Sequence, residues 1–353
     1  MENLAETLGR LAAPGTLFRA MPDGRLECYA CGLRCCLKDG MAGACAVRFN
    51  KGGRLMVPWG YVAGLQADPI EKKPFFHVLP GSRALSFGML GCCYSCAFCQ
   101  NWVSSQALRD PSAGHEVRPC SARDIVKAAV ENGCLTVAST YNEPLITSEW
   151  AVEVFREAKE AGLACCYVSN GSATPEVLDF LRPWVDFFKV DLKCFDEGTY
   201  RRLMGGPMKA VLDTLAGLLE RGFWVEVVTL VIPGVNDSDA ELNAIGRFLV
   251  SLSPDIPWHV TAYHRDYRMK GAESTPAASV LKAAEIGKAA GLRHVYAGNL
   301  AGPGGGWEDT SCPGCGTVLI ERRGFRVMGS RLAVEGSKGF CPKCRHPIAG
   351  VWG

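Results

Sequence analysis

Apolar strand-like runs alternate with helical patterns from about residue 83 to residue 300, and this alternation constrains the fold more than any other feature of the chain. Strands that alternate with helices in this way form parallel βα units. Polar or glycine residues follow strand after strand, at the end where parallel α/β barrels place their active sites. The sequence therefore predicts an α/β fold with six or seven units, a partial (β/α)6-type barrel that is open on one side.

The predicted elements follow one another in a regular order. The strands are expected at 84–87, 135–139, 164–168, 187–190, 224–231, 258–263 and 294–296. The helices are expected at 121–132, 147–161, 175–181, 208–220, 239–250 and 277–289. Ser121 is a favourable N-terminal cap for the first of these helices, and Gly133 is a favourable end.

A loop after the first strand carries Cys92, Cys96 and Cys99 at C-x3-C-x2-C spacing. A cluster with four irons normally takes four thiolates. Three thiolates leave one iron with an open position, which is what separates a catalytic metal site from a closed structural one. Cys93 is a competing ligand because it is evenly spaced with Cys96 and Cys99. A zinc knuckle or free buried thiols are the alternative interpretations of the loop.

Thirteen of the 18 cysteines form three groups that mark three modules. We expect a cysteine-rich N-terminal module at 1–82, the barrel at 83–305 and a C-terminal module at 306–353. Two C-x2-C pairs in the last module predict facing knuckles of the zinc-ribbon or rubredoxin type. The predicted zinc ligands are Cys312, Cys315, Cys341 and Cys344. The alternative is four free thiols, but a module this small needs a metal for much of its stability.

The N-terminal module places its cysteines at irregular spacings, and Cys36 next to Cys35 adds an ambiguity. Three interpretations fit this group: a second metal ion or cluster, a redox or soft-substrate thiol site, and structural cysteines without a ligand. The candidate ligands of a second metal site are Cys28, Cys31, Cys35 and Cys45. The remaining cysteines are expected in the core, at Cys120, Cys134, Cys165, Cys166 and Cys194.

Length and composition fit one medium-sized enzyme, with 353 residues of which 48% are hydrophobic and 21% charged. A formal net charge of +2 gives no electrostatic argument for binding nucleic acid or an anionic membrane. No apolar run approaches 18 residues, and the first residues lack the pattern of a signal peptide. Abundant cysteine without a secretion signal indicates metal binding in a reducing cytoplasm rather than disulfides.

Motifs along almost the whole chain resemble one family. The strings CYACGLRCCLKDGMAGACAVR, CQNW, TYNEP, PGVND, CPGCGTVLIERRGF and CPKCRHPIAGVWG together resemble the radical S-adenosylmethionine (SAM) enzymes of the AmmeMemoRadiSam system, relatives of pyruvate formate-lyase activating enzyme. The resemblance implies a 4Fe-4S cluster with SAM on the fourth iron, and its spacing favours Cys92 over Cys93. It also implies an electron donor such as flavodoxin or ferredoxin, and Memo-like and AMMECR-like proteins as partners.

The resemblance places SAM contacts at the ends of two predicted strands. Glu143 can accept hydrogen bonds from the SAM ammonium group while Asn142 fixes its orientation. Ser169 and Asn170 resemble the segment that contacts the ribose, and Phe98 can cover the cluster. A rim salt bridge for Glu143 and a simple turn at Asn170 are the structural alternatives.

Asp191-Leu192-Lys193 resembles the D-x-K motif of glycyl-radical activating enzymes, with Lys193 placed to meet the SAM carboxylate. Side chains at i and i+2 of a strand face the same side, so both charges can point into one cavity. A solvated surface pair is the alternative. His264 and His259 lie near a strand end and are candidate donors to SAM or substrate, or ordinary rim histidines.

The expected function is reductive cleavage of SAM to methionine and a 5′-deoxyadenosyl radical, which abstracts hydrogen from a substrate that no residue identifies. Two alternatives belong to other classes. One is an activase that acts on a glycine of a partner protein, and the other is a non-catalytic zinc-binding adaptor.

Overall fold

The structure is a computed structural model that describes residues 4–114, 116–300 and 305–353. The chain divides into two units, and it passes between them several times. Unit 1 contains the segments up to Ala67, Ala84–Phe188 and Tyr200–Phe223. Unit 2 contains Asp68–Arg83, Lys189–Thr199 and Trp224–Gly353.

Three parallel strands form the centre of unit 1: β9 (Arg83–Gly88), β11 (Thr136–Ser139) and β12 (Ala164–Ser169). Strand β11 lies in the middle and pairs with both neighbours in parallel. Every residue of β11 is buried, as expected for a parallel strand covered on both faces. The helices of this unit are α2 (Trp102–Ser105), α3 (Ala122–Glu131), α4 (Ser148–Glu160), α5 (Pro175–Leu181) and α7 (Met208–Glu220).

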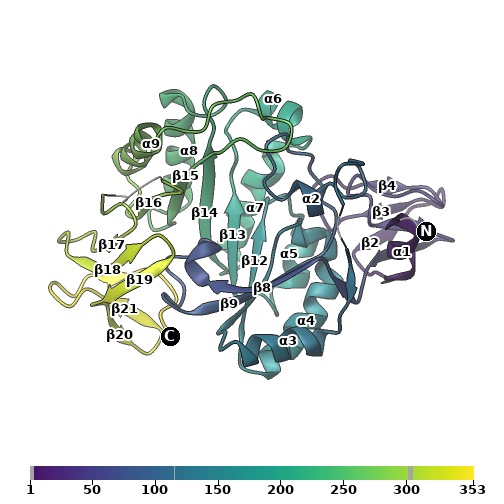
Figure 1. The fold of residues 1–353 in the computed structure, drawn as a ribbon, viewed down its shortest axis with the longest axis horizontal. Coiled ribbons are helices and arrows are strands. Elements are labelled where there is room, and N and C mark those ends of the chain that lie inside the picture. The colour runs from purple at the N-terminus through teal and green to yellow at the C-terminus, as the bar shows by residue number, and fades with distance from the viewer. Residues whose placement is uncertain (1–3, 115, 301–304) are drawn as a thin grey trace. The chain divides into compact units, whose positions relative to one another are not determined.

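Helix α3 shows why the sequence pattern predicted these elements well. The Ser121 hydroxyl accepts a hydrogen bond from the Asp124 amide, and the Asp124 carboxylate accepts one from the Ser121 amide. This reciprocal capping box satisfies two amides that have no partner inside the helix. Gly133 follows the helix at a φ of 63°, a conformation that glycine adopts without strain. Helices α3 and α4 then lie side by side (Figure 1).

The N-terminal part of unit 1 is built from short elements. Helix α1 (Leu4–Arg10) precedes two small antiparallel sheets, β1-β6-β5 and β2-β3-β4. Their strands are β1 (Ala12–Pro14), β2 (Phe18–Ala20), β3 (Leu26–Cys28), β4 (Cys36–Leu37), β5 (Phe49–Lys51) and β6 (Arg54–Pro58). Strand β7 (Tyr61–Val62) pairs with β10 (Arg118–Pro119), and β8 (Gly64–Pro69) leads to a 3₁₀ helix at Ile70–Lys72.

Unit 2 contains the parallel strands β14 (Trp224–Val231), β15 (Trp258–Ala262) and β16 (Val295–Gly298). Its helices are α6 (Glu197–Thr199), α8 (Asp239–Leu252) and α9 (Ala277–Ala290), and β13 (Phe187–Asp191) begins in unit 1 and ends here. The C-terminal strands are β17 (Thr310–Ser311), β18 (Val318–Arg323), β19 (Arg326–Ser330), β20 (Ala333–Glu335), β21 (Lys338–Phe340) and β22 (Pro347–Ile348).

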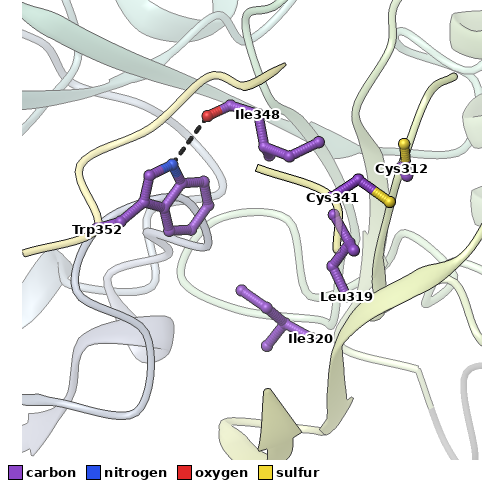
Figure 2. Packing of buried hydrophobic residues seen from close by; sticks show 6 residues of the cluster. All are labelled: Cys312, Leu319, Ile320, Cys341, Ile348 and Trp352. Carbon is purple, nitrogen blue, oxygen red and sulfur yellow. Dashed lines mark hydrogen bonds between the residues drawn. The ribbon is translucent and has the colours of Figure 1, made fainter. Parts of the chain in front are cut away.

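The C-terminal strands share a small core of Cys312, Leu319, Ile320, Cys341, Ile348 and Trp352 (Figure 2). The Trp352 indole N–H donates to the Ile348 carbonyl at 2.9 Å, so its polar edge is satisfied inside this core. Two of the six side chains are cysteines, which is consistent with a module too small for an ordinary apolar core.

A buried carboxylate, Glu226 on β14, fixes the segment 68–83 within unit 2. It accepts hydrogen bonds from the amides of Phe76 (3.0 Å) and His77 (2.9 Å). It also accepts from His259 Nε2 at 2.7 Å and from the Trp224 indole at 3.2 Å. These donors compensate for the desolvation of a fully buried carboxylate.

Glu226→Gln is expected to lower the free energy of unfolding by about 3–5 kcal/mol, because an amide group would turn a donor toward groups that already donate. The measurement is urea unfolding of the purified protein. Glu321→Gln, an exposed position of β18, is the control and should change stability by no more than about 0.5 kcal/mol. Equal stability of the two variants would contradict the structural role of Glu226.

A chain of hydrogen bonds connects the C-terminal strands to His77. Arg322 donates to Thr310 Oγ1 at 2.7 Å, and Thr310 lies 2.9 Å from the Tyr296 hydroxyl. Tyr296 can then donate to His77 Nε2, while His77 Nδ1–H donates to the Ala349 carbonyl, both at 2.6 Å. This direction requires a neutral His77 whose Nε2 accepts. Burial accordingly lowers the pKa of His77 well below its ordinary value.

Stability is expected to fall as the pH is lowered from about 6.5 toward 4. Burial lowers the pKa of His294, beside His77, from 6.5 to about 4. The unfolded chain therefore binds more protons in this window, so the stability present above pH 6.5 is lost on acidification. His294→Asn should flatten the slope of urea-unfolding free energy against pH, with metal content followed in the same samples. An unchanged slope would show that His294 does not titrate in this range.

The predicted strands and helices between 84 and 298 are confirmed, with ends that differ by at most two residues. The α/β alternation and the parallel pairing are thus confirmed within each unit, while closure into a partial barrel and the three module boundaries remain predictions. Cys134, Cys165, Cys166 and Cys194 are buried as expected, whereas Cys120 is only half-buried. In the part of the chain that the structure describes, no helix is long and apolar enough to cross a membrane.

Candidate metal and cofactor sites

The loop with Cys92, Cys96 and Cys99 follows β9 in unit 1 and lies against the segment that follows β11. Tyr141 in that segment adopts a φ of 72°, which is unusual for a bulky residue and occurs preferentially at functional sites. Gly88 makes room for it, since a Cβ there would lie 2.8 Å from the Tyr141 ring. The close approach of these two strand ends therefore depends on a glycine at position 88.

Asn142 and Glu143 hold this segment on the cysteine loop. The Asn142 side-chain oxygen accepts a hydrogen bond from the Met89 amide at 3.0 Å. The Glu143 amide donates to the Gly91 carbonyl at 3.4 Å. Both side chains are buried, so the structure brings these two predicted site residues to the base of the loop.

The Glu143 carboxylate joins the ends of β11 and β12. It accepts from the Ser169 hydroxyl and from the Asn170 amide, each at 2.7 Å, and from the Leu145 amide at 3.1 Å. Ser169 and Asn170, which sequence reasoning placed at the ribose, are thus positioned by the residue predicted to hold the SAM amino group. Glu143 orients its neighbours in addition to any contact with a ligand.

Asn170 extends this network to the cysteines. Its side-chain nitrogen lies 3.2 Å from Cys93 Sγ and 3.8 Å from Cys92 Sγ. The two adjacent thiols differ in environment, because Cys93 is buried and hydrogen-bonded to the Cys31 thiol, whereas Cys92 is half-buried. The hydrogen bonds to Cys31 and Cys92, with burial, raise the pKa of the Cys93 thiol well above its usual value.

The backbone of the loop is held by the segment before α7. The Ser95 and Ala97 amides donate to the carbonyls of Met204 (2.8 Å) and Leu203 (3.0 Å), in a π-helical stretch at Tyr200–Met204. A Cβ at Gly206 would overlap the Tyr94 ring, so this packing requires glycine. The loop is therefore fixed by long-range contacts and not by its own sequence alone.

The three loop cysteines suit an iron–sulfur cluster in their chemistry. Cys92 Sγ accepts from the Tyr94 amide at 3.3 Å, and Cys99 Sγ lies 3.3 Å from the Ser105 hydroxyl. Hydrogen bonds to ligating sulfurs are a common feature of iron–sulfur sites. Cys96 and the predicted cover residue Phe98 are buried beside them. A thiolate set with polar donors and an apolar cover fits the group.

Asp191, Lys193 and His264 lie in unit 2. The ammonium groups of Lys189 and Lys193 both pair with the Asp191 carboxylate. Lys193 Nζ lies 3.0 Å from Asp191 Oδ2. Burial alone would raise the pKa of Asp191, but the two ammonium groups outweigh it and lower that pKa to about 2. The Asp191 carboxylate thus lies between the two ammonium groups. His264 is exposed, and His259 is buried on Glu226 as described above.

The four C-terminal cysteines form a compact set. All four sulfurs lie within 4.8 Å of one another. Cys312 Sγ is 3.6 Å from Cys344 Sγ, and Cys315 Sγ is 3.6 Å from Cys341 Sγ. A tetrahedral ion with metal–sulfur bonds of about 2.3 Å separates its sulfurs by about 3.8 Å. This arrangement can hold one metal ion.

The local backbone produces that geometry. The amides of Gly316 and Arg345 donate to the carbonyls of Cys312 (2.8 Å) and Cys341 (2.9 Å), closing each C-x2-C turn. Both residues have positive φ, 71° and 62°. A hydrogen bond from the Thr317 hydroxyl lowers the pKa of the Cys315 thiol to about 6, which favours the thiolate that a metal binds.

The N-terminal cysteines are gathered in unit 1. Burial raises the pKa of Cys35 and of Cys45, the latter to about 12, and Cys31 is a neighbour that raises both further. Cys28 and Cys36 are also neighbours of Cys35. The exposed thiol of Cys36 points away to the Arg34 carbonyl, whereas Cys35 Sγ accepts from the Ala44 amide. The structure thus distinguishes these two adjacent cysteines.

Sequence reasoning missed two arginines that support these sites. Arg48 is fully buried and forms a bidentate pair with Glu149 on α4, at 2.6 and 2.8 Å. Arg109 donates to the carbonyls of Ala44 and Cys92. Arg48 lies three residues after Cys45 in the motif CAVR, which was a usable signal, but nothing near Arg109 marks it.

Comparisons with known proteins agree with this chemistry. A model of the radical SAM superfamily matches residues 88–243, the range that holds the loop cysteines, Glu143, Asn170 and Lys193. An uncharacterized protein of Methanocaldococcus jannaschii is 33% identical over 333 residues, covering 94% of this chain and 97% of that protein. The chain belongs to the radical SAM superfamily. Enzymes of this superfamily use a 4Fe-4S cluster, SAM and a reductant.

Two further proteins with known activities are similar to parts of this chain. Pyruvate formate-lyase-activating enzyme of Staphylococcus aureus is 25% identical over 197 residues, 53% of this chain and 76% of that enzyme. The crystal structure of a radical SAM methyltransferase from Sphaerobacter thermophilus aligns with a TM-score of 0.49 and 15% identity, over 84% of this chain and 81% of that one.

Proposed function

We propose that Cys92, Cys96 and Cys99 hold the 4Fe-4S cluster and that SAM binds at its fourth iron. The observation that carries this assignment is the hydrogen-bonded network that connects Asn142, Glu143 and Asn170 to the cysteine loop within unit 1. When bound, the cluster supplies the electron that splits SAM into methionine and a 5′-deoxyadenosyl radical, which abstracts hydrogen from a substrate.

The residues of the chain orient and shield this chemistry. Phe98 and Cys96 are buried, whereas Cys92 and Cys99 are half-buried, so burial shields part of the loop from water. Glu143 fixes Ser169 and Asn170 by accepting from both. We infer that Glu143 and Asn142 bind the SAM amino group and that Ser169 and Asn170 bind the ribose. The roles of Asp191, Lys193 and His264 in SAM binding remain predictions from the resemblance.

The similarity to pyruvate formate-lyase-activating enzyme favours a second candidate, an activase whose substrate is a glycine of a partner protein. In both cases hydrogen abstraction is the common step. Memo-like and AMMECR-like proteins are further candidate partners, and flavodoxin or ferredoxin is the proposed reductant. Superfamily membership favours an enzyme over a non-catalytic adaptor. We also propose that the C-terminal cysteines bind zinc, and a cytoplasmic location remains a prediction.

The proposed reaction is tested without a known substrate by reducing the anaerobically purified protein with dithionite in the presence of SAM. We expect 5′-deoxyadenosine and methionine in equal amounts. A protein that contains its iron but forms neither product would overturn the proposal. Adding a candidate glycyl-radical partner separates the two candidate substrates, because only an activase transfers the radical to that protein.

Glu143→Gln is expected to weaken SAM binding by about 1.5–3 kcal/mol, the usual contribution of a hydrogen bond to a charged group. Equilibrium dialysis with labelled SAM measures the affinity, and iron content should stay at the wild-type value because Glu143 is not a thiolate ligand. The matched control is Glu160→Gln, an exposed carboxylate at the end of α4. If SAM affinity is the same in both variants, Glu143 does not bind the ammonium group.

A further inference from the structure

The N-terminal cysteines have the surroundings of metal-bound thiolates. Cys28, Cys31 and Cys45 are buried, and Cys35 is half-buried. The Arg48 guanidinium donates to Cys28 Sγ at 3.2 Å, and the Ala44 amide donates to Cys35 Sγ at 3.5 Å. N–H donors aimed at cysteine sulfurs stabilise ligating thiolates and tune iron–sulfur sites.

The backbone here repeats features of the C-terminal knuckles. Ala46 directly follows Cys45 with a φ of 63°, as Arg345 follows Cys344 with a φ of 62°. The Cys28 amide donates to the Cys35 carbonyl at 2.9 Å, and Cys341 donates across its own turn to His346 at the same distance. A left-handed conformation is costly for alanine or arginine, so both sites retain strain beside a cysteine.

Three contacts connect this group to the loop with Cys92, all within unit 1. The Cys31 thiol is hydrogen-bonded to Cys93, the chain neighbour of Cys92. Gly91 approaches the Cys45 carbonyl so closely that a Cβ would lie 2.8 Å from it. Arg109 donates to the carbonyl of Ala44, next to Cys45, and to the carbonyl of Cys92. The N-terminal cysteines and the loop are therefore one continuous cysteine-rich region.

We propose that Cys28, Cys31, Cys35 and Cys45 hold a second four-iron cluster, which passes electrons from an external one-electron donor to the loop. In each transfer the second cluster gains one electron from a protein such as flavodoxin and then loses it to the cluster at the loop. A zinc ion bound by these cysteines could not act as a relay, because zinc(II) has no redox chemistry. The relay rests on the proposed function, whereas the existence of the second cluster does not.

Iron analysis tests the site itself. The reconstituted wild-type protein should contain about eight irons per chain, four for each cluster. Cys35→Ala should retain about four, and the matched control Cys36→Ala should keep the wild-type content, since its thiol is exposed. The triple variant Cys92→Ala, Cys96→Ala, Cys99→Ala should also keep about four irons. This last variant detects the second cluster even if Cys35→Ala fails to fold.

Four irons in the wild type, accompanied by zinc that disappears in Cys35→Ala, would show a zinc site and overturn the proposal. Four irons in the wild type and none in the triple variant would show that the group binds no metal cluster. Absence of SAM cleavage in the wild type and in every variant, with iron retained in the triple variant, would reject the proposed function and leave the second cluster standing.

The relay is tested by the choice of reductant. Cys35→Ala should lower the flavodoxin-driven rate of 5′-deoxyadenosine formation by about tenfold or more, while dithionite, a small reductant that can reach the loop directly, should support the wild-type rate. Cys36→Ala should match the wild type with both reductants. Equal losses with both reductants, or none with either, would exclude a role in electron delivery.

Discussion

Cys92→Ala, Cys96→Ala and Cys99→Ala are each expected to abolish SAM cleavage completely, whereas Cys93→Ala retains it. A cluster that keeps only two protein thiolates loses the defined open iron on which the reaction depends. Cys93 is different because its buried thiol is hydrogen-bonded to Cys31 and Asn170. The measurement is 5′-deoxyadenosine formed after reduction, together with iron per chain.

The adjacent pair Cys92 and Cys93 makes this comparison its own control, since both variants remove one thiol from the same turn. Activity in Cys92→Ala and none in Cys93→Ala would mean that the ligand assignment is wrong. Loss of activity in both, with unchanged iron, would mean that the turn itself matters more than either sulfur.

Cys341→Ser is expected to release about one zinc per chain and to unfold the C-terminal strands. Apparent binding free energies of structural zinc are about 10–16 kcal/mol in small modules, so loss of the metal removes most of their stability. Cys341 is also fully buried in the core shown in Figure 2. Metal analysis and limited proteolysis with fragment mapping measure the outcome, which should be cleavage after about residue 306.

Cys120→Ser is the control, because Cys120 is half-buried and lies outside the cysteine groups. The iron of Cys341→Ser should stay at the wild-type value, since Cys341 is no ligand of the loop. A variant that keeps its zinc, or a wild type with iron at this site, would contradict the structural zinc. Loss of iron from the loop in this variant would show that iron binding at the loop depends on the folded C-terminal strands.

Local signals predicted the elements of this chain well. The capping box at Ser121 and the glycine at position 133 are set by residues within one turn of α3. The C-terminal knuckles are equally local, because their closing hydrogen bonds join residues four apart. Periodicity and spacing are sufficient for such features, since the interacting groups are close in the sequence.

The long-range networks could not be predicted in this way. Glu226 accepts from the amides of Phe76 and His77, 150 and 149 residues earlier in the chain. The residues around a backbone amide do not indicate which distant side chain accepts its hydrogen bond. The pairing of Arg48 with Glu149, 101 residues apart, is of the same kind. Such contacts also integrate the C-terminal strands into unit 2, through Arg322 and Tyr296.

The candidate site also combines features that the local sequence predicted with features that depend on long-range contacts. Spacing and the predicted strand ends led to the candidate loop cysteines and to the candidate residues after each strand. The family resemblance favoured Cys92 over Cys93, but the local sequence alone distinguishes neither this pair nor Cys35 from Cys36, because adjacent residues share one local sequence. The structure separates both pairs by burial and by hydrogen-bond partners. It also gives Glu143 a second role, positioning Ser169 and Asn170, that no pattern indicated.

Low-temperature electron paramagnetic resonance of the reduced protein, recorded with and without SAM, tests the central claim most directly. If three thiolates leave one iron open and SAM occupies it, SAM must change the spectrum of the loop cluster. We expect that change in the wild type and in Cys35→Ala, and none in Cys96→Ala. A spectrum of the wild type that SAM leaves unaltered, in protein with full iron content, would contradict the account.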